Sequence, residues 1–146
     1  REHRLLGVFG SELKMGSAKL VINSITWSYV DAHQVANIKQ FRAERLNIRI
    51  ENKEYLNANA DVSTDRVRFM IANDSPFNYF SVQLSVVLYY GDEVTGVEYV
   101  DVAPFRALSE QNVEVHTESR GLSPTRIEVL PHVNIYDPTA YIQIGG

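Results

Sequence analysis

The stretch SVQLSVVLYY, residues 81–90, followed by Gly91 and Asp92, is the part of the chain that most clearly predicts the fold. Apolar side chains recur there at every second position. Successive side chains of a β-strand point to opposite faces of a sheet, so this alternation predicts a strand with one buried face. Gly91 accepts a positive φ, and an extended pattern rich in Val and Tyr resumes over residues 94–102. The two segments are therefore predicted to form a β-hairpin.

Further extended segments lie on both sides of this hairpin, at residues 19–27, 46–50, 66–73, 112–117 and 126–135. Pro131 interrupts the last of them, which predicts an edge strand or a bulge, because proline cannot donate to the sheet ladder. The side chains expected to be buried in the two best-defined strands are Val67, Phe69, Ile71, Val82, Leu84, Val86 and Leu88. About seven short strands with turn signals between them describe an all-β antiparallel sandwich better than an α/β fold.

Residues 31–45 break the strand pattern. Val35, Ile38 and Phe41 recur there at helical spacing, with no Gly or Pro between them, which predicts one short helix near the N-terminus. We expect residues 18–146 to form a single Ig-like or fibronectin-III-like sandwich with this helix as an insertion. Residues 1–17 are then a linker or the end of a preceding segment.

Composition excludes several classes of protein. The 146 residues include 45% hydrophobic and 22% charged residues, as in an ordinary folded domain. A formal net charge of -4 argues against a nucleic-acid partner, which would attract a basic surface. No stretch has the roughly 20 consecutive apolar residues that a membrane helix needs. The absence of cysteine excludes disulfides and thiol catalysis and leaves the compartment open.

The turn and strand-end residues between Val67 and Ile135 show a family resemblance. They are Asn73-Asp74-Ser75, the run Val86-Val87-Leu88-Tyr89-Tyr90, Gly91-Asp92, Gly96, and a polar loop at Ser109-Glu110-Gln111 before another strand. In order and spacing they resemble the FxLYD-type domains, Ig-like sandwiches of prokaryotic cell-envelope proteins. The resemblance implies an extracytoplasmic, non-catalytic domain, and we expect the chain to be a fragment of a longer, membrane-tethered protein.

Aromatic residues near loops are the candidate binding residues. Phe77, Tyr79 and Phe80 lie between a turn and a strand, and Tyr99 lies on the hairpin strand at residues 94–102, which we expect to offer a free edge. Aromatic side chains in such positions can anchor a protein partner or stack on a sugar. The alternative is that Phe77 or Phe80 closes one end of the hydrophobic core.

No pattern in the sequence indicates catalysis or a cofactor. Serine-hydrolase and phosphate-binding motifs are absent, and none of the four histidines lies within four residues of another. Oxygen-bearing side chains alternate over residues 57–65, as calcium would require, but Val62 and Arg68 occupy the places of the Gly and Glu of a calcium loop. We therefore expect no enzymatic activity, no metal site and no cofactor.

These observations favour a structural or protein-interaction module of a cell-envelope or secreted protein. Its expected partner is another envelope protein or a neighbouring domain of the same protein. The alternative is a sandwich that binds carbohydrate or peptide, which would require a concave site that no sequence motif singles out.

Overall fold

The computed structural model describes residues 24, 35, 37–59, 64–117 and 123–142. The chain divides into two units, Arg1–Ala36 and Asn37–Gly146. The predicted boundary at residues 17–18 lies outside the described residues. The second unit contains all the described secondary structure. Its elements are α1 (Ile38–Arg45), β1 (Ile48–Leu56), β2 (Asp65–Asn73), β3 (Val82–Tyr90), β4 (Glu93–Val102), β5 (Ser109–Thr117), β6 (Arg126–His132) and the 3₁₀ helix η1 (Pro138–Ala140).

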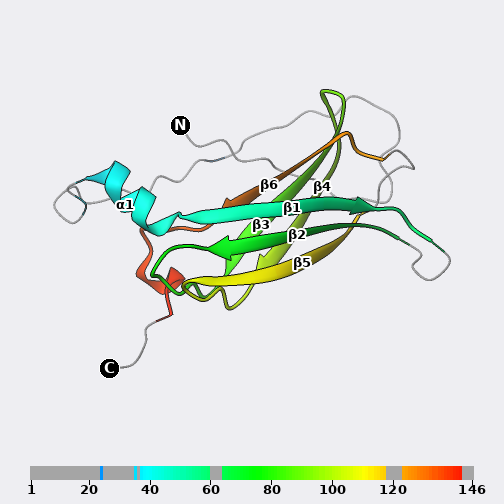
Figure 1. Cartoon of the computed structure of the whole chain (residues 1–146). Helices are drawn as coiled ribbons and strands as arrows, with labels where there is room; N and C mark the ends of the chain where they lie inside the picture. The colour runs from blue at the N-terminus through cyan, green and yellow to red at the C-terminus, as the bar shows by residue number, and fades with distance from the viewer. Residues whose placement is uncertain (1–23, 25–34, 36, 60–63, 118–122, 143–146) are drawn as a thin grey trace. The chain divides into compact units, whose positions relative to one another are not determined.

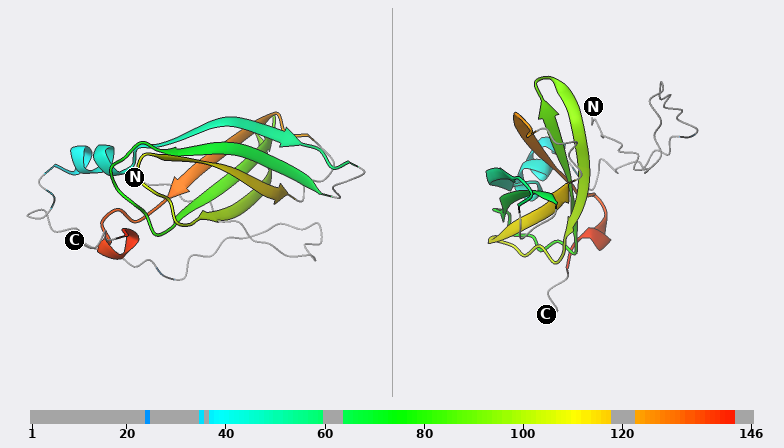
Figure 2. Two further views of the ribbon diagram at one scale, coloured as in Figure 1. Left: turned by 60° about the horizontal axis from the view of Figure 1, so that its bottom comes forward. Right: turned by 90° about the vertical axis from the view of Figure 1, so that its right-hand side faces the viewer.

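The strands form two antiparallel sheets of three strands each, in the orders β1-β2-β5 and β4-β3-β6. Figures 1 and 2 show one sheet lying across the other as separate layers. The predicted all-β antiparallel architecture is confirmed, with six strands in the described part of the chain. Of the strand predicted over residues 19–27 only Ser24 is described, so that prediction lies outside the described residues.

The core lies between the two sheets. All seven side chains that were predicted to be buried are at most 1% exposed. Phe69, on the inner face of β2, packs in one hydrophobic cluster with Leu84 and Leu88 of β3. The alternation in the sequence therefore identified the inner face of both central strands, because each strand has a neighbour on both sides and the opposite sheet above it.

The helix is shorter than residues 31–45. It begins at Ile38, because Asn37 caps it: the side-chain oxygen Oδ1 of Asn37 accepts a hydrogen bond from the backbone N–H of Gln40 at 3.1 Å. Its last turn carries Arg42 and Arg45, whose charge suits the negative end of the helix dipole. In the described part of the chain, no helix has the length and apolar character needed to cross a membrane.

Three strands differ clearly from their predicted ranges. β6 ends at His132 instead of Ile135. β1 continues to Leu56, past a register shift between Glu51 and Glu54 at which Asn52 has φ 54°. Such a bulge breaks the period-two pattern, which is why the second half of this strand was not evident in the sequence. β5 begins at Ser109, which pairs with Asn73, so the expected polar loop before it is part of the strand.

Two further predictions, the turn at Gly91 and the edge position of the strand that contains Pro131, are confirmed among the described residues. Gly91 has φ 61° in the β3–β4 turn, a conformation that glycine adopts without steric cost. Pro131 lies on β6, which is an edge strand of its sheet among the described residues. Among the strands that the structure describes, β4 is the other edge of the same sheet.

Candidate functional site

One end of the sandwich gathers α1, the β2–β3 loop and η1 (Figure 1). Backbone hydrogen bonds join the β2–β3 loop to the β4–β5 loop at the same end. Three of the four predicted binding residues, Phe77, Tyr79 and Phe80, belong to the β2–β3 loop, whereas Tyr99 lies on β4. This loop end of the sandwich is therefore the candidate site.

Asn73, the last residue of β2, organises the two loops. Its side chain is fully buried, and its Nδ2 donates to the backbone carbonyls of Phe77 at 2.8 Å and Arg106 at 3.0 Å. Its Oδ1 accepts from the backbone N–H of Ser75 at 3.1 Å and from the Ser75 hydroxyl at 2.7 Å. The amide thus uses its full hydrogen-bonding capacity to tie the β2–β3 loop to the β4–β5 loop.

Tyr79 is a core residue. It pairs through isolated antiparallel bridges with Phe105 on one side and Tyr141 on the other, and it is 0% exposed. Its hydroxyl donates to the backbone carbonyl of Arg45 at the end of α1, and burial raises the pKa of that hydroxyl. A side chain without exposed area has nothing to offer a partner of the folded domain, so Tyr79 acts in packing.

Phe77 also contributes to the structure of this end. The Arg45 guanidinium lies 4.4 Å from the centroid of the Phe77 ring and 3.7 Å from that of Phe41. The Phe77 ring also contacts the ring of Tyr141, with centroids 5.6 Å apart. These cation–π and aromatic contacts hold α1 against the end of the sandwich and leave Phe77 half-buried.

Phe80 is the one candidate in the β2–β3 loop that stands out into solvent, with 69% of its surface exposed. Its backbone N–H donates to the carbonyl of Ala140, while Ile142 donates to the carbonyl of Asn78. Asn78 and Phe80 flank the bridged residue Tyr79, so their side chains belong to the same side of it. Asn78 lines an open hollow of about 360 Å³ together with Pro104, Arg106 and Ile142, and Phe80 is therefore placed beside this hollow. We call Phe80 and these four lining residues the bridge face.

Tyr99 lies on the edge strand β4 and is half-buried. It is opposite Ser85 of β3, so its side chain belongs to the outer face of the β4-β3-β6 sheet. Acidic residues flank it at Glu98 and Asp101, and charge of this kind discourages the addition of a further strand. The β4 edge is thus a second candidate surface, less open to strand addition than its Val and Tyr content predicted.

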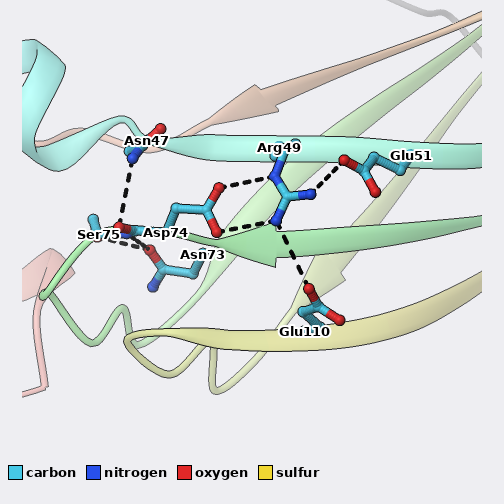
Figure 3. Close-up of polar contacts among 7 residues, drawn as sticks. All are labelled: Asn47, Arg49, Glu51, Asn73, Asp74, Ser75 and Glu110. Carbon is cyan, nitrogen blue, oxygen red and sulfur yellow. Dashed lines mark hydrogen bonds and ion pairs between the residues drawn. The ribbon is translucent and has the colours of Figure 1, made fainter.

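A network of charges lies next to the loop end, on the outer face of the β1-β2-β5 sheet (Figure 3). The Arg49 guanidinium donates to both oxygens of Asp74, at 2.9 Å from Nε and 3.2 Å from Nη2, and it is also bonded to Glu51. Glu110 adds a longer ion pair at 3.7 Å. Because these acidic groups surround the Arg49 guanidinium, the network joins β1, β2 and β5 and does not offer Arg49 to a ligand.

The Arg49–Asp74 pair gives a testable acid–base prediction. The hydrogen bonds from Arg49 hold the pKa of Asp74 below its ordinary value. A depressed pKa in the folded state stabilises the fold above the ordinary carboxyl pKa, and this contribution is lost as the pH falls through the folded-state pKa. Arg49→Ala is therefore expected to raise the pKa of Asp74 toward its ordinary value, measured from its carboxyl carbon shift by NMR.

Glu114 provides the internal control for this experiment. Its pKa is also lowered, by hydrogen bonds from Arg68 and then Arg66 farther along the same sheet. The Arg49 variant should leave the pKa of Glu114 unchanged. Asp74 titrating at its ordinary value in the unmodified protein would contradict the network.

The oxygen-rich run at residues 57–65 is described only in part. The carboxylate of Asp65 accepts from the backbone N–H of Ala58 at 2.6 Å and from the Tyr55 hydroxyl at 2.7 Å, so both of its oxygens already serve the protein. Within the described ranges, no three His, Cys, Asp or Glu side chains form a group that could hold a metal ion. The absence of a metal, a cofactor and catalysis stays a prediction.

The sequence interpretation missed four residues of the bridge face, namely Asn78, Pro104, Arg106 and Ile142. They come from the β2–β3 loop, the β4–β5 loop and the segment after η1, which are distant in the sequence, and the backbone bridges of Tyr79 bring these segments together. The only local signal was the run of polar and aromatic residues around Phe80.

Comparisons with known proteins give no match to this chain among protein families, curated proteins or solved structures.

Proposed function

We propose that this domain is a non-enzymatic protein-interaction module that contacts its partner through the bridge face. The observation that carries the proposal is Phe80, a large aromatic side chain that is 69% exposed beside a hollow. Exposed aromatic residues next to concave surfaces supply much of the binding energy in protein interfaces. The loop around Phe80 is held in place by the hydrogen bond from Asn73 to Phe77 and by the bridges of Tyr79. The surface is therefore ordered before a partner binds, which lowers the entropic cost of binding.

The wider setting of the module is part of the same proposal. An Ig-like or fibronectin-III-like sandwich of FxLYD type in an extracytoplasmic, membrane-tethered envelope protein agrees with the strand-end and turn residues of the sequence. Two antiparallel sheets with loops gathered at one end are the architecture that such modules use for binding. The partner is then another envelope protein or a neighbouring domain.

Site-specific photo-crosslinking in the native cells tests this proposal. The full-length protein would carry p-benzoylphenylalanine in place of Phe80, and after irradiation the adduct would be identified by mass spectrometry. We expect an adduct with a second polypeptide or with a peptide of a neighbouring domain. The matched control is Tyr90, which is 50% exposed at the opposite end of β3.

The outcomes separate the candidate surfaces. An adduct at position 80 and none at position 90 supports the bridge face. A crosslink from Tyr99 alone would move the interface to the β4 edge and contradict the assignment.

The second candidate function is carbohydrate or peptide binding, for which the hollow beside Phe80 is the supporting observation. Glycan-array binding that Phe80→Ala abolishes would favour carbohydrate over a protein partner.

A further inference from the structure

In the hollow of the bridge face, the backbone carbonyls and the side-chain donors differ in whether they already have hydrogen-bond partners. The backbone carbonyl of Asn78 accepts from the N–H of Ile142 at 2.9 Å, and the carbonyl of Pro104 accepts from Gln111 at 3.0 Å. The carbonyl of Arg106 accepts from Asn73 Nδ2 at 3.0 Å. The carbonyls of these lining residues are therefore already engaged.

The side-chain donors of the hollow, in contrast, have no acceptor among the described residues. Asn78 Oδ1 accepts from the backbone N–H of Ala107 at 3.0 Å, which fixes the orientation of the amide and leaves its Nδ2 without an acceptor among the described residues. No described residue pairs with the Arg106 guanidinium, whereas the strand arginines Arg49, Arg66 and Arg68 are each paired with a carboxylate. The described residues that line the hollow include no Asp or Glu. The hollow offers donors and positive charge, so its ligand must accept hydrogen bonds and carry negative charge.

The rest of the surface indicates which anion fits. Pro104 and Ile142 line the hollow, and Phe80 is exposed beside it, so the ligand also presents an apolar group. A volume of about 360 Å³ is at the lower end of the range of ligand pockets, so the part of a ligand that it covers is short. The end of a polypeptide carries a carboxylate and a side chain on the same residue. A phosphate group is typically bound by several cationic side chains or by the N-terminus of a helix.

We infer that the bridge face binds the C-terminal carboxylate of a partner polypeptide whose last residue is apolar. The carboxylate accepts hydrogen bonds from Arg106 and from Asn78 Nδ2, and the last side chain packs on Pro104, Ile142 and Phe80. This inference rests on the proposed function, because it names the part of the partner that the interaction surface recognises. Capture of a chain terminus is an established mode of peptide recognition.

NMR titration of the 146-residue chain with synthetic peptides tests the inference. The probe is acetyl-Gly-Ser-Leu-Phe with a free C-terminal carboxylate, and its matched control is the same peptide with a C-terminal amide. We expect saturable shifts of the Asn78 side-chain amide and the backbone amides of Ala107 and Ile142. The amidated peptide should bind at least about tenfold more weakly. Equal binding of the two peptides would overturn the inference.

Two arginine variants provide the protein control. Arg106→Ala should weaken binding of the free-acid peptide at least about tenfold and leave the fold intact, because the contacts of Arg106 within the domain use its backbone carbonyl. Arg42→Ala should change nothing, since Arg42 is another exposed arginine without an acidic partner among the described residues, on α1. Unchanged binding by the Arg106 variant would overturn the inference.

Two further ligands test the chemistry. The peptide acetyl-Gly-Leu-Glu-Phe-amide carries its carboxylate on a side chain, and if it binds as tightly as the free-acid peptide, the assignment to a chain terminus is wrong. Inorganic phosphate that displaces the peptide at lower concentration would likewise overturn it. If the peptides fail while position 80 still crosslinks to a partner in cells, the carboxylate inference falls and the interaction module stands.

Discussion

Asn73→Ala is expected to lower the free energy of unfolding by about 3 to 5 kcal/mol, as measured by urea denaturation. The buried amide makes four hydrogen bonds, to Phe77, to Arg106 and two to Ser75. Alanine would leave the Phe77 carbonyl and the Ser75 N–H without partners in a region that water does not reach freely, whereas the Arg106 carbonyl would keep its hydrogen bond from the Ser109 hydroxyl. Each such group costs about 1 to 3 kcal/mol, so the sum is a large share of the stability of a small domain.

Asn112→Ala is the matched control for this substitution. Asn112 lies on β5 with an exposed side chain, opposite Met70 of β2. Its replacement should change the free energy of unfolding by no more than about 0.5 kcal/mol. A cost below about 1 kcal/mol for the Asn73 variant would show that the two loops keep their arrangement without the amide.

Loss of Asn73 should also disturb the bridge face. The amide holds the carbonyl of Arg106 and that of Phe77, which directly precedes Asn78 in the β2–β3 loop. Peptide binding by an Asn73→Ala protein that is still folded should therefore weaken together with its stability, even though Asn73 itself does not line the hollow.

Leu88→Ala is expected to cost about 2 to 5 kcal/mol through lost burial and the cavity that remains. Leu88 is 1% exposed on the inner face of β3, in the same cluster as Phe69 and Leu84. Its neighbour across the hairpin is Gly96, where a Cβ would lie 3.3 Å from Leu88 Cδ1. Because glycine has no side chain to move into the space, the cavity cannot close from that side, and we expect a cost in the upper half of the range.

Leu108→Ala makes the same chemical change at an exposed position, since Leu108 is 77% exposed in the β4–β5 loop. Both leucine and alanine carry a Cβ, so the positive φ of Leu108 affects them alike. Thermal and urea unfolding should place this variant within about 0.5 kcal/mol of the unmodified protein. Similar costs for the two leucine variants would contradict the two-sheet core.

The strands and the core were predictable because their signal is local. A residue on a half-buried strand alternates with its neighbours, so Val67, Phe69 and Ile71 could be assigned to an inner face without knowledge of any partner strand. The prediction was wrong where local geometry interrupts the period. The bulge at Asn52 ended the pattern of β1 early, and the polar start of β5 at Ser109 looked like a loop because its pairing with β2 is not visible in the sequence.

Local sequence was enough to establish the all-β class, the Gly91 turn and the aromatic character of the segment around Phe80. Which residue of that segment is buried was decided by tertiary packing. Neighbouring side chains point to opposite sides, so one of Tyr79 and Phe80 had to be buried and the other exposed. The bridges of Tyr79 to Phe105 and Tyr141 place Tyr79 in the core and leave Phe80 at the surface. The sequence alone also could not predict that Asn78 and Arg106 line the same hollow. They are distant in the sequence, and no local pattern reports which hydrogen-bond donors remain free after the loops have packed.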